Sequence, residues 1–374
     1  MRVLHVFTVP VTRNGITMFA LQRLPGLRAA GVAVDFVSPG AVEADLLRQI
    51  EGEGARVFVL AQKRPSRAYV GALSALVRRE RYDIVHAHGN SSSLFFEMLA
   101  ARLGGCRARV AHSHNTTCNH IRQDRYLRPL FYRSYTAAAA CGNDAGKWLF
   151  ETRPFTVLPN AVDIARFRFN PQTRAHMRAA LGIDEGEMVL GHVGRFNGQK
   201  NHRFLLEVFK AFLALRPNAR LLLVGDGYLE AEARAQAAPL GQRVIFAGSV
   251  PNPEAYLCAM DSMALPSLFE GFPTVLLEWQ CAGLPTLVSD RVTREAALTP
   301  LARYLPLEAG AAAWAEALAA LPAPERTQAS ETGAAALKAG GYALEDAADA
   351  LLRFYRTISG PGKSRSPWNR RGAP

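Results

Sequence analysis

The sequence predicts an α/β protein of two domains, each a doubly wound parallel sheet with helices on both faces. Short segments rich in β-branched and apolar residues alternate along the chain with segments of helical apolar spacing. That alternation favours parallel sheets covered on both faces. It restarts near residue 188, and a single sheet of about a dozen strands would be unusually wide. Two separate sheets are therefore expected.

The strands of the two domains are expected at short apolar runs, and helical spacing separates most of them, as at 67–81 and 92–103. In the first domain we expect strands at residues 2–8, 32–38, 56–60, 83–89, 109–115, 136–142 and 155–158. In the second domain we expect them at residues 188–195, 220–225, 244–248, 262–265 and 286–289.

A Pro-Asn turn at 159–160, followed by a polar stretch, marks the junction between the domains. We therefore expect an N-terminal domain at 1–163 and a C-terminal domain at 164–343. Residues 344–359 have the spacing of an amphipathic helix, which could cross back to the first domain. Residues 360–374 carry basic but no acidic side chains, so a disordered tail is expected there.

The composition is that of an ordinary globular protein, with 374 residues, 49% of them hydrophobic and 20% charged. No uncharged apolar run reaches about 18 residues, and the first residues resemble a strand rather than a signal peptide. Five scattered cysteines without metal-site spacing fit reduced thiols in the cytoplasm. The net charge of +12 suits a nucleotide diphosphate, an anionic lipid or a nucleic acid, or simply a basic soluble surface.

The most informative segment, 267–285, places Glu270 and Glu278 on either side of a turn that opens a helix. Pro273 suits a first helical turn, whose unpaired N–H groups attract anions and sugar oxygens. Glu278, inside the helix, could accept hydrogen bonds from two neighbouring hydroxyls such as a ribose diol. A solvated surface glutamate explains Glu278 poorly, because its sequence neighbours are apolar. The segment predicts a site for a nucleotide-sugar.

A glycine-rich loop at 189–202 carries the cations Arg195 and Lys200 between a strand and a helix. Two cations on such a loop could bind a diphosphate, arginine as a planar fork and lysine as a point charge. The loop contains neither a dinucleotide-binding G-x-G-x-x-G motif nor a P-loop. Taken alone, it is also consistent with a solvated turn.

Two features lie at the carboxyl ends of first-domain strands, where ligands bind in open α/β sheets. Gly15 follows the first strand and would let the backbone approach a phosphate. His112 and His114 end the fifth strand, so one of them should face the cleft. A metal would need a third ligand at suitable spacing, and the sequence offers none. We expect no metal and one structural histidine.

The basic and aromatic segment 122–135 has two interpretations that the sequence leaves open. Arginines among aromatic and leucine side chains at helical spacing suit a helix that lies on a membrane surface. A core helix with a solvated arginine face has the same pattern. Whether this segment or the basic tail contacts a membrane is not decided by the sequence.

Taken in order, these segments resemble a retaining nucleotide-sugar glycosyltransferase of the GT-B fold, family 4, in its exopolysaccharide and capsular polysaccharide branch. The fold that this implies is a pair of Rossmann-like domains facing a cleft. The resemblance covers residues 83–290 and the first strand and turn. Its phrases are DIVHAHGNSSSLFF, RVAHSHNTT, GNDAGKWLF, VLPNAVD, GHVGRFNGQKNHRFLLEVF, ARLLLVGDG and LPSLFEGFPTVLLEWQCAGLPTLVSD.

The resemblance implies a role for each site residue. Arg195 and Lys200 would hold the donor diphosphate, and Glu278 would bind the ribose diol. His114 would sit beside the reacting sugar, and Gly15 would lie under the phosphates. The donor sugar would be held by the carboxylate and backbone of Glu270, Gly271, Phe272, Pro273 and Thr274. Such enzymes need no metal, and this chain has no Asp-x-Asp.

The implied reaction moves a hexose-type sugar from a nucleotide-diphosphate sugar, with UDP-sugars favoured, to a saccharide or lipid-linked saccharide. The implied location is cytoplasmic, without nucleic-acid partners. A sugar-nucleotide epimerase of the same fold and a non-catalytic scaffold of a polysaccharide assembly complex stay open as alternatives. Three residues depart from the family pattern: Asn14 and Ala161 replace glycines, and Trp279 replaces an alanine.

Overall fold

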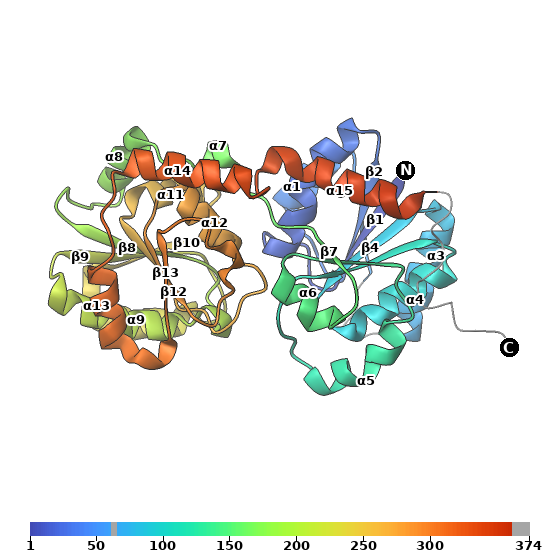
Figure 1. Ribbon diagram of the computed structural model, residues 1–374, viewed down its shortest axis with the longest axis horizontal. Helices are drawn as coiled ribbons and strands as arrows, with labels where there is room; N and C mark the ends of the chain where they lie inside the picture. Colours follow the sequence, from blue (N-terminus) through green and yellow to red (C-terminus); the bar gives the residue numbers. More distant parts are fainter. Residues whose placement is uncertain (61–65, 361–374) are drawn as a thin grey trace. The chain divides into compact units, whose positions relative to one another are not determined.

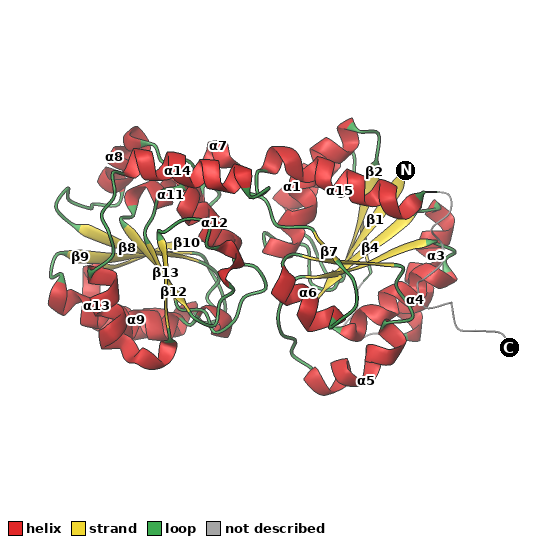
Figure 2. Ribbon diagram, in the orientation of Figure 1, coloured by secondary structure: helices red, strands yellow, loops and turns green. Residues whose placement is uncertain are grey.

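The computed structural model describes residues 1–60 and 66–360, which form two compact units (Figure 1). One unit comprises Met1–Ala161 together with the chain from Leu344 onward, and the other comprises Val162–Ala343. Each is a parallel sheet between layers of helices (Figure 2), so the predicted fold class is confirmed. The expected disordered tail lies, from residue 361 onward, outside the described residues.

The first unit contains a seven-stranded sheet in the order β3-β2-β1-β4-β5-β6-β7, with every neighbouring pair parallel. The chain order reverses between β1 and β4, which makes the sheet doubly wound. The strands are β1 Arg2–Phe7, β2 Ala33–Ser38, β3 Val57–Val59, β4 Ile84–Gly89, β5 Ala108–Ser113, β6 Ala137–Ala140 and β7 Thr156–Val157. Alternate strand residues enter two apolar cores, one on each face.

Two helices of the first unit, α1 and α3, begin with side-chain caps. Asn14 caps α1, since its Oδ1 accepts hydrogen bonds from the backbone N–H groups of Ile16 and Thr17, both at 3.0 Å. The last helix, α15, packs against α1 so closely that a Cβ added at Gly26 would lie 2.5 Å from the Cβ of Ala348. The helices are α1 Gly15–Ala29, α2 Ala44–Gly52, α3 Arg67–Glu80, η1 Ser92–Leu94, α4 Phe95–Leu103, α5 Ile121–Phe131, α6 Asn143–Phe150 and α15 Leu344–Ser359.

The second unit contains a six-stranded parallel sheet in the order β10-β9-β8-β11-β12-β13. Its strands are β8 Met188–Val193, β9 Ala219–Val224, β10 Val244–Gly248, β11 Ser262–Leu265, β12 Thr286–Ser289 and β13 Ala302–Leu305. The prediction omitted β13, whose four residues contain no β-branched side chain and are followed directly by Pro306. Pairing with β12 along its whole length makes this segment a strand.

The helices of the second unit cover both faces of its sheet (Figure 2). Its main core gathers side chains from β8, β9, α9 and α13. The helices are α7 Ile164–Phe167, α8 Pro171–Ala180, η2 Gly198–Lys200, α9 His202–Leu215, α10 Glu230–Ala237, η3 Ala238–Arg243, α11 Pro253–Ala259, α12 Thr274–Cys281, η4 Arg294–Ala296, η5 Leu307–Ala309, α13 Gly310–Ala319 and α14 Arg326–Ala339.

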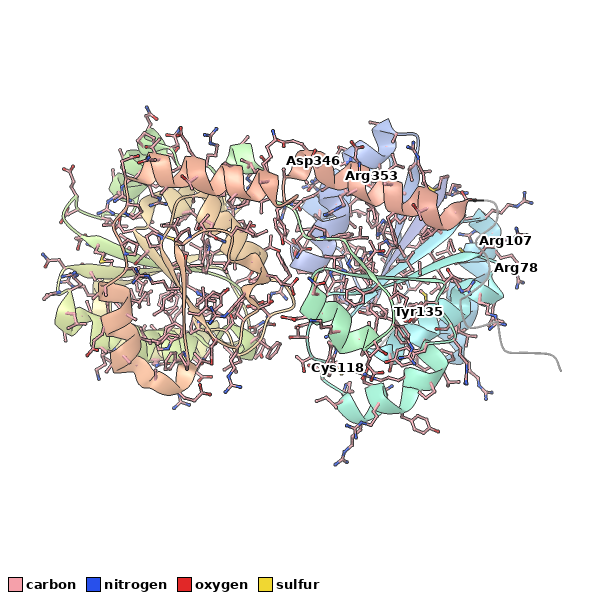
Figure 3. The ribbon with its side chains drawn as sticks, in the orientation of Figure 1. Arg78, Arg107, Cys118, Tyr135, Asp346 and Arg353 are labelled. Atoms are coloured by element: carbon pink, nitrogen blue, oxygen red, sulfur yellow. The ribbon has the colours of Figure 1, made fainter. Side chains whose placement is uncertain are left out.

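Several strands end earlier than the sequence suggests. The fifth strand stops at Ser113 rather than residue 115, and β8 stops at Val193 rather than residue 195. His114 and Arg195 therefore lie in loops directly beyond the carboxyl ends of their strands, which is where parallel sheets place ligand-binding groups. Large basic side chains elsewhere, such as Arg78, Arg107 and Arg353, extend into solvent (Figure 3).

Candidate active site

The second unit brings together the two segments that the sequence predicts to bind a nucleotide-sugar. Lys200 Nζ donates to Glu270 Oε1 at 2.7 Å, and Gln199 Nε2 donates to Glu270 Oε2 at 2.8 Å. A backbone hydrogen bond of 2.8 Å from Leu268 to Gln199 joins the same two loops. Glu270 is only 7% exposed. An ion pair this well enclosed is screened less by solvent than a surface pair, and its strength depends on this geometry.

The loop before Lys200 is shaped by its own side chains. Asn197 accepts a hydrogen bond from the backbone N–H of Lys200 at 3.1 Å, which caps η2. Asn201 adopts a left-handed conformation with φ of 56°, so that the chain turns directly into α9. Asparagine tolerates this region better than most residues. Together the two asparagines fix where the lysine leaves the backbone.

Arg195 is exposed and forms no ion pair with any described residue. Its loop packs against the backbone at the carboxyl end of β9. The backbone N–H of Gly194 donates to Val224 at 2.9 Å, and a Cβ added at Gly225 would lie 2.2 Å from the Gly194 carbonyl oxygen. Gly225 also has φ of 137°, which side chains rarely permit. The close approach of backbone to backbone thus explains why glycine stands here.

Glu278 lies half-buried on α12, which starts after Pro273 without a side-chain cap. Burial raises the pKa of Glu278 to about 7, and the positive charges of Arg166 and Lys200 oppose that rise only in part. Its carboxylate forms no hydrogen bond with the described residues. A carboxylate in this setting favours a ligand that brings hydroxyl donors, because these would compensate for the lost hydration.

The turn between Glu270 and α12 is buried rather than solvated. Gly271, Phe272 and Pro273 are all buried, while Thr274 is half-buried. Phe272 stacks on Tyr342 with ring centroids 5.5 Å apart. Trp279, which replaces an alanine of the family pattern, is fully buried and therefore enlarges the core.

In the first unit, Gly15 is the first residue of α1, and a Cβ added there would meet nothing within 4 Å. Space therefore remains beside this backbone, whose helix end is already satisfied by Asn14. His114 lies half-buried directly after β5, and its backbone N–H donates to Gly89 at 3.0 Å. Its Nε2 lies 2.9 Å from His88 Nδ1. His114 thus belongs to a larger group of histidines.

That group comprises His5, His86, His88, His112 and His114, from three adjacent strands and the loop after β5. Burial lowers the pKa of each, to about 3 for His5 and His114. Only His112 and His114 were predicted from the sequence, although the alternating HAH and HSH patterns place both members of each pair on one sheet face. Sequence spacing shows no third ligand beside His112 and His114, whereas the neighbouring strand β4 brings His88 next to them.

Two sets of three histidines have ring nitrogens close enough to one another to hold a metal ion. One set is His5, His86 and His88, and the other is His88, His112 and His114. Most of these nitrogens, however, already form hydrogen bonds with one another at 2.7 to 2.9 Å. Binding a metal would require breaking that network, so the donor set does not match a site prepared for a cation.

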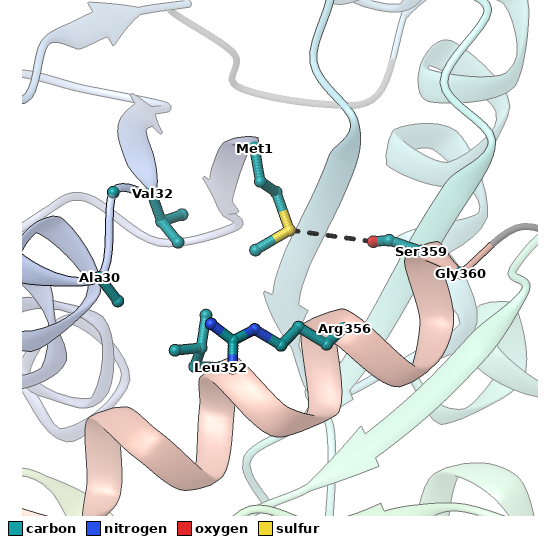
Figure 4. A pocket seen from close by; sticks show the side chains of 8 residues that line it. Met1, Ala30, Val32, Leu352, Arg356, Ser359 and Gly360 are labelled. Carbon is teal, nitrogen blue, oxygen red and sulfur yellow. Dashed lines mark hydrogen bonds between the residues drawn. The ribbon is translucent and has the colours of Figure 1, made fainter.

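One pocket lies away from all of these residues. It has a volume of about 350 Å³ and lies between α15 and the edge formed by Met1 and Val32, with Leu352 and Arg356 in its wall (Figure 4). It contains none of the predicted site residues. None of the described helices is long and apolar enough to span a membrane.

Comparison with known proteins identifies the class of protein. The family described as Glycosyltransferase Family 4 matches residues 13–166, and the family described as Glycosyl transferases group 1 matches residues 187–323. Among solved structures, HepE of Anabaena in complex with UDP has a TM-score of 0.76 at 18% identity, covering 96% of this chain and 100% of HepE. A glycosyltransferase of Rickettsia africae has a TM-score of 0.78 at 14% identity, with coverages of 96% and 99%. The fold is therefore GT-B.

Two curated proteins are similar to this chain in sequence as well. EpsF of Bacillus subtilis, whose name describes a glycosyltransferase, is 33% identical over 378 residues, which cover 95% of this chain and 96% of EpsF. A UDP-Gal:α-D-GlcNAc-diphosphoundecaprenol α-1,3-galactosyltransferase of Escherichia coli is 29% identical over 59% of this chain and 60% of its own length. The chain belongs to the family 4 glycosyltransferases, as its motifs predict, and is an enzyme that uses nucleotide-sugars.

Proposed function

We propose that this enzyme transfers a hexose from a UDP-sugar, with retention of configuration, to a saccharide or lipid-linked saccharide during polysaccharide synthesis. The observation that carries the proposal is the enclosed pair of Lys200 and Glu270 beside the start of α12. The E. coli relative is named for a UDP-sugar donor and a lipid-diphosphate acceptor, and HepE was crystallised with UDP-glucose. These names support the choice of donor and acceptor.

In this proposal the second unit binds the donor. Lys200 and Arg195 contact the diphosphate, and their charge stabilises it as it leaves, because negative charge grows there in the transition state. Glu270 keeps Lys200 in place through one oxygen. A carboxylate has about four acceptor sites, so Glu270 can still bind sugar hydroxyls. The backbone of Gly271, Phe272, Pro273 and Thr274 completes the sugar site.

Glu278 would bind the nucleotide end of the donor. Two neighbouring ribose hydroxyls would donate to its carboxylate, which forms no hydrogen bond within the described residues. Charged hydrogen bonds are stronger than neutral ones, so this contact should contribute a large share of the donor affinity.

The first unit would supply the acceptor side. Gly15 leaves room for the donor phosphates, and His114 contacts the transferred sugar. The acceptor hydroxyl would attack the face from which the diphosphate leaves, and a donor phosphate oxygen would take its proton. No metal is assigned a role, because Lys200, Arg195 and the start of α12 offset the leaving-group charge. Transfer that persists in excess chelator would agree with this assignment.

We also propose a cytoplasmic enzyme that contacts the inner face of the membrane through α5. Ile121, Tyr126 and Leu130 are 54%, 82% and 46% exposed, and Arg122 and Arg125 lie on the same helix. Apolar side chains beside arginines favour an anionic lipid surface. Sedimentation with vesicles containing anionic lipid should retain the protein, and Tyr126→Asp should weaken that retention. Equal retention on purely zwitterionic vesicles would contradict the proposal.

The function is tested by incubating the enzyme with a panel of nucleotide-sugars and following products by mass spectrometry. We expect one donor to raise the melting temperature, since ligands that bind the native state stabilise it. With a saccharide-diphosphate-lipid acceptor, that donor should be consumed and its sugar attached. Release of an altered sugar without acceptor would indicate the epimerase. No affinity for any nucleotide-sugar would indicate the scaffold.

A further inference from the structure

Five histidines and one tyrosine in the first unit form a single unbranched chain of hydrogen bonds, here called the histidine chain. In order, it runs His112, His86, Tyr355, His5, His88 and His114. The joining atoms are His112 Nδ1 with His86 Nε2 at 2.9 Å, His86 Nδ1 with the Tyr355 hydroxyl at 2.7 Å, that hydroxyl with His5 Nε2 at 3.2 Å, His5 Nδ1 with His88 Nε2 at 2.7 Å, and His88 Nδ1 with His114 Nε2 at 2.9 Å.

Because side chains alternate between the two faces of each strand, the histidines of the histidine chain gather on one face of the sheet. His5 on β1 pairs in register with His86 on β4, and His88 pairs with His112 on β5. All four lie on the sheet face that α1 and α15 cover, where Phe19 meets His112 with ring centroids 4.7 Å apart. Each ring is buried, except that of His114, which is half-buried beyond the strand end. One end of the chain is therefore deep in the core and the other at the functional edge.

The number of protons and the burial of Tyr355 restrict the histidine chain to two arrangements. Each neutral imidazole carries one N–H and the tyrosine carries one O–H, which gives six protons for the five hydrogen bonds above. If every bond has one proton, the sixth lies on His112 Nε2, on His114 Nδ1, or on a Tyr355 hydroxyl that accepts from both of its neighbours. The last arrangement would leave a buried O–H without an acceptor among the described residues, because Tyr355 is fully buried, so the sixth proton lies at an end. Every intermediate proton then points in the same direction. The state of the buried end thus decides the state of His114.

The buried end favours one of these arrangements. His112 Nε2 is buried and has no hydrogen-bond partner among the described residues. An N–H there would be an unsatisfied buried donor, which is rarer in proteins than an unsatisfied acceptor. The Arg23 guanidinium, held over the Phe19 ring at 3.9 Å, adds positive charge that disfavours a further proton on the histidines. When Nε2 of His112 is unprotonated, the sixth proton lies on Nδ1 of His114.

We propose that the histidine chain fixes His114 as a neutral imidazole protonated on Nδ1, which donates a hydrogen bond to an oxygen of the transferred sugar. His114 is then a donor and not a general base, because its Nε2 is occupied by the N–H of His88. His88, His5, Tyr355, His86 and His112 are positioning residues. The tautomer follows from the chain alone, whereas the contact with sugar rests on the function proposed above.

The same surroundings keep His114 neutral over the working pH range. The titratable and charged groups around it are His88 on β4, His5 on β1, His86 and His112 in the chain, Arg23 on α1, and Tyr355 on α15. None of these carries negative charge at neutral pH, because burial raises the pKa of Tyr355 well above its ordinary value. Burial, with Arg23 and His5, lowers the pKa of His114 to about 3. Turnover should show no ionisation from His114 between about pH 5 and 8.

The tautomer is tested directly by ¹⁵N NMR of histidine-labelled full-length enzyme, with the His114 signals assigned from their loss in His114→Asn. We expect a protonated Nδ1 and a bare Nε2 on His114 throughout that pH range. A protonated Nε2, or an imidazolium, would overturn the proposal. Adding equimolar Zn²⁺ should leave the histidine signals in place. A joint shift of the signals of three histidines would identify a metal site and would also overturn the proposal.

The effect of the neighbour is tested by a pair of variants at His88. Asparagine can place an amide N–H where Nδ1 stood, and leucine cannot. In His88→Leu we expect His114 to shift toward the Nε2–H tautomer, with turnover reduced about tenfold for the lost neutral hydrogen bond. His88→Asn should restore the Nδ1–H signal and most of the turnover. Unchanged ¹⁵N shifts in a folded His88→Leu would contradict control by the chain.

The role of the proton is tested at His114 itself. Asparagine keeps a donor near the Nδ1 position, whereas glutamine places its amide nearer Nε2. We expect His114→Asn to retain turnover within about tenfold of wild type, and His114→Gln to lose about ten- to a hundredfold. A loss of about a thousandfold or more in both would indicate a general base and refute the donor role. If wild type transferred no sugar at all, the proposed function would fail while the NMR result on the tautomer still stood.

Discussion

The functional edges of the two units differ in charge: one is neutral and the other carries ionised side chains. The first unit presents His114 at the end of a chain of histidines whose pKa values are lowered by burial, so the edge is neutral. The second unit presents Lys200 bonded to Glu270, with exposed Arg195 and half-buried Glu278 near the same loops. A donor nucleotide is anionic and a sugar is not. The difference indicates that charge is concentrated where the diphosphate binds, and that pH should act on the site chiefly through the second unit.

The largest expected effect comes from removing the lysine. We expect Lys200→Ala to lower turnover by about a hundred- to a thousandfold, as for loss of one group that stabilises a developing negative charge. The change also leaves Glu270 enclosed without its cation, so the melting temperature should fall. Lys210→Ala, at an exposed lysine on α9, is the matched control and should change neither quantity. Turnover near that of wild type would remove Lys200 from the diphosphate site.

A smaller effect is expected at the nucleotide end. Glu278→Gln keeps the shape of the side chain and removes its charge, so at pH 8 the affinity for UDP and UDP-sugar should fall about ten- to a hundredfold. Isothermal titration measures this loss, and Glu316→Gln on the exposed face of α13 is the control. A mutant that loses turnover but binds UDP as tightly as wild type would move Glu278 away from the ribose.

The pH dependence should separate the two edges. The pKa of Glu278 is raised from 4.5 to about 7 by burial, so between these values the folded state binds more protons than the unfolded state. Stability from this group therefore falls as pH rises through that window. Affinity for UDP should change in the opposite sense, weakening as pH falls through 7, because a protonated carboxyl accepts hydrogen bonds less well.

Thermal unfolding and UDP titration from pH 5 to 8 measure both trends in wild type and Glu278→Gln. In the variant, the part of each slope that arises from Glu278 should disappear. A pH dependence that is lost in His114→Asn instead would reverse the comparison and assign the titrating group to the first unit.

The sequence predicted the charged edge better than the neutral one. Glu270 and Lys200 stand out because each lies at a strand-to-helix turn of recognisable pattern, and their pairing follows once both strands are parallel neighbours, as β8 and β11 are. Gln199 was missed, since an amide in a polar loop carries no pattern of its own. The histidine chain was missed because its members are up to 350 residues apart, from His5 to Tyr355, and only strand order, register and the packing of α15 align them. Long-range side-chain networks depend on register, which local spacing does not specify.

The smallest effect on activity is expected at Tyr355, which joins the two halves of the histidine chain. Tyr355→Phe removes the hydroxyl that serves both His86 and His5 but leaves His88 bonded to His114. We expect the free energy of unfolding to fall by about 1–3 kcal/mol, because two buried ring nitrogens lose their partner. Turnover should fall only a few-fold, because the unpartnered and buried His5 Nε2 should stay unprotonated, which keeps His5, His88 and His114 in the same arrangement. Tyr126→Phe, on an 82% exposed ring, controls for loss of a hydroxyl and should change stability by no more than about 0.5 kcal/mol. Denaturant unfolding measures both, and a Tyr355→Phe protein as stable as wild type would show that the chain is not continuous through the tyrosine.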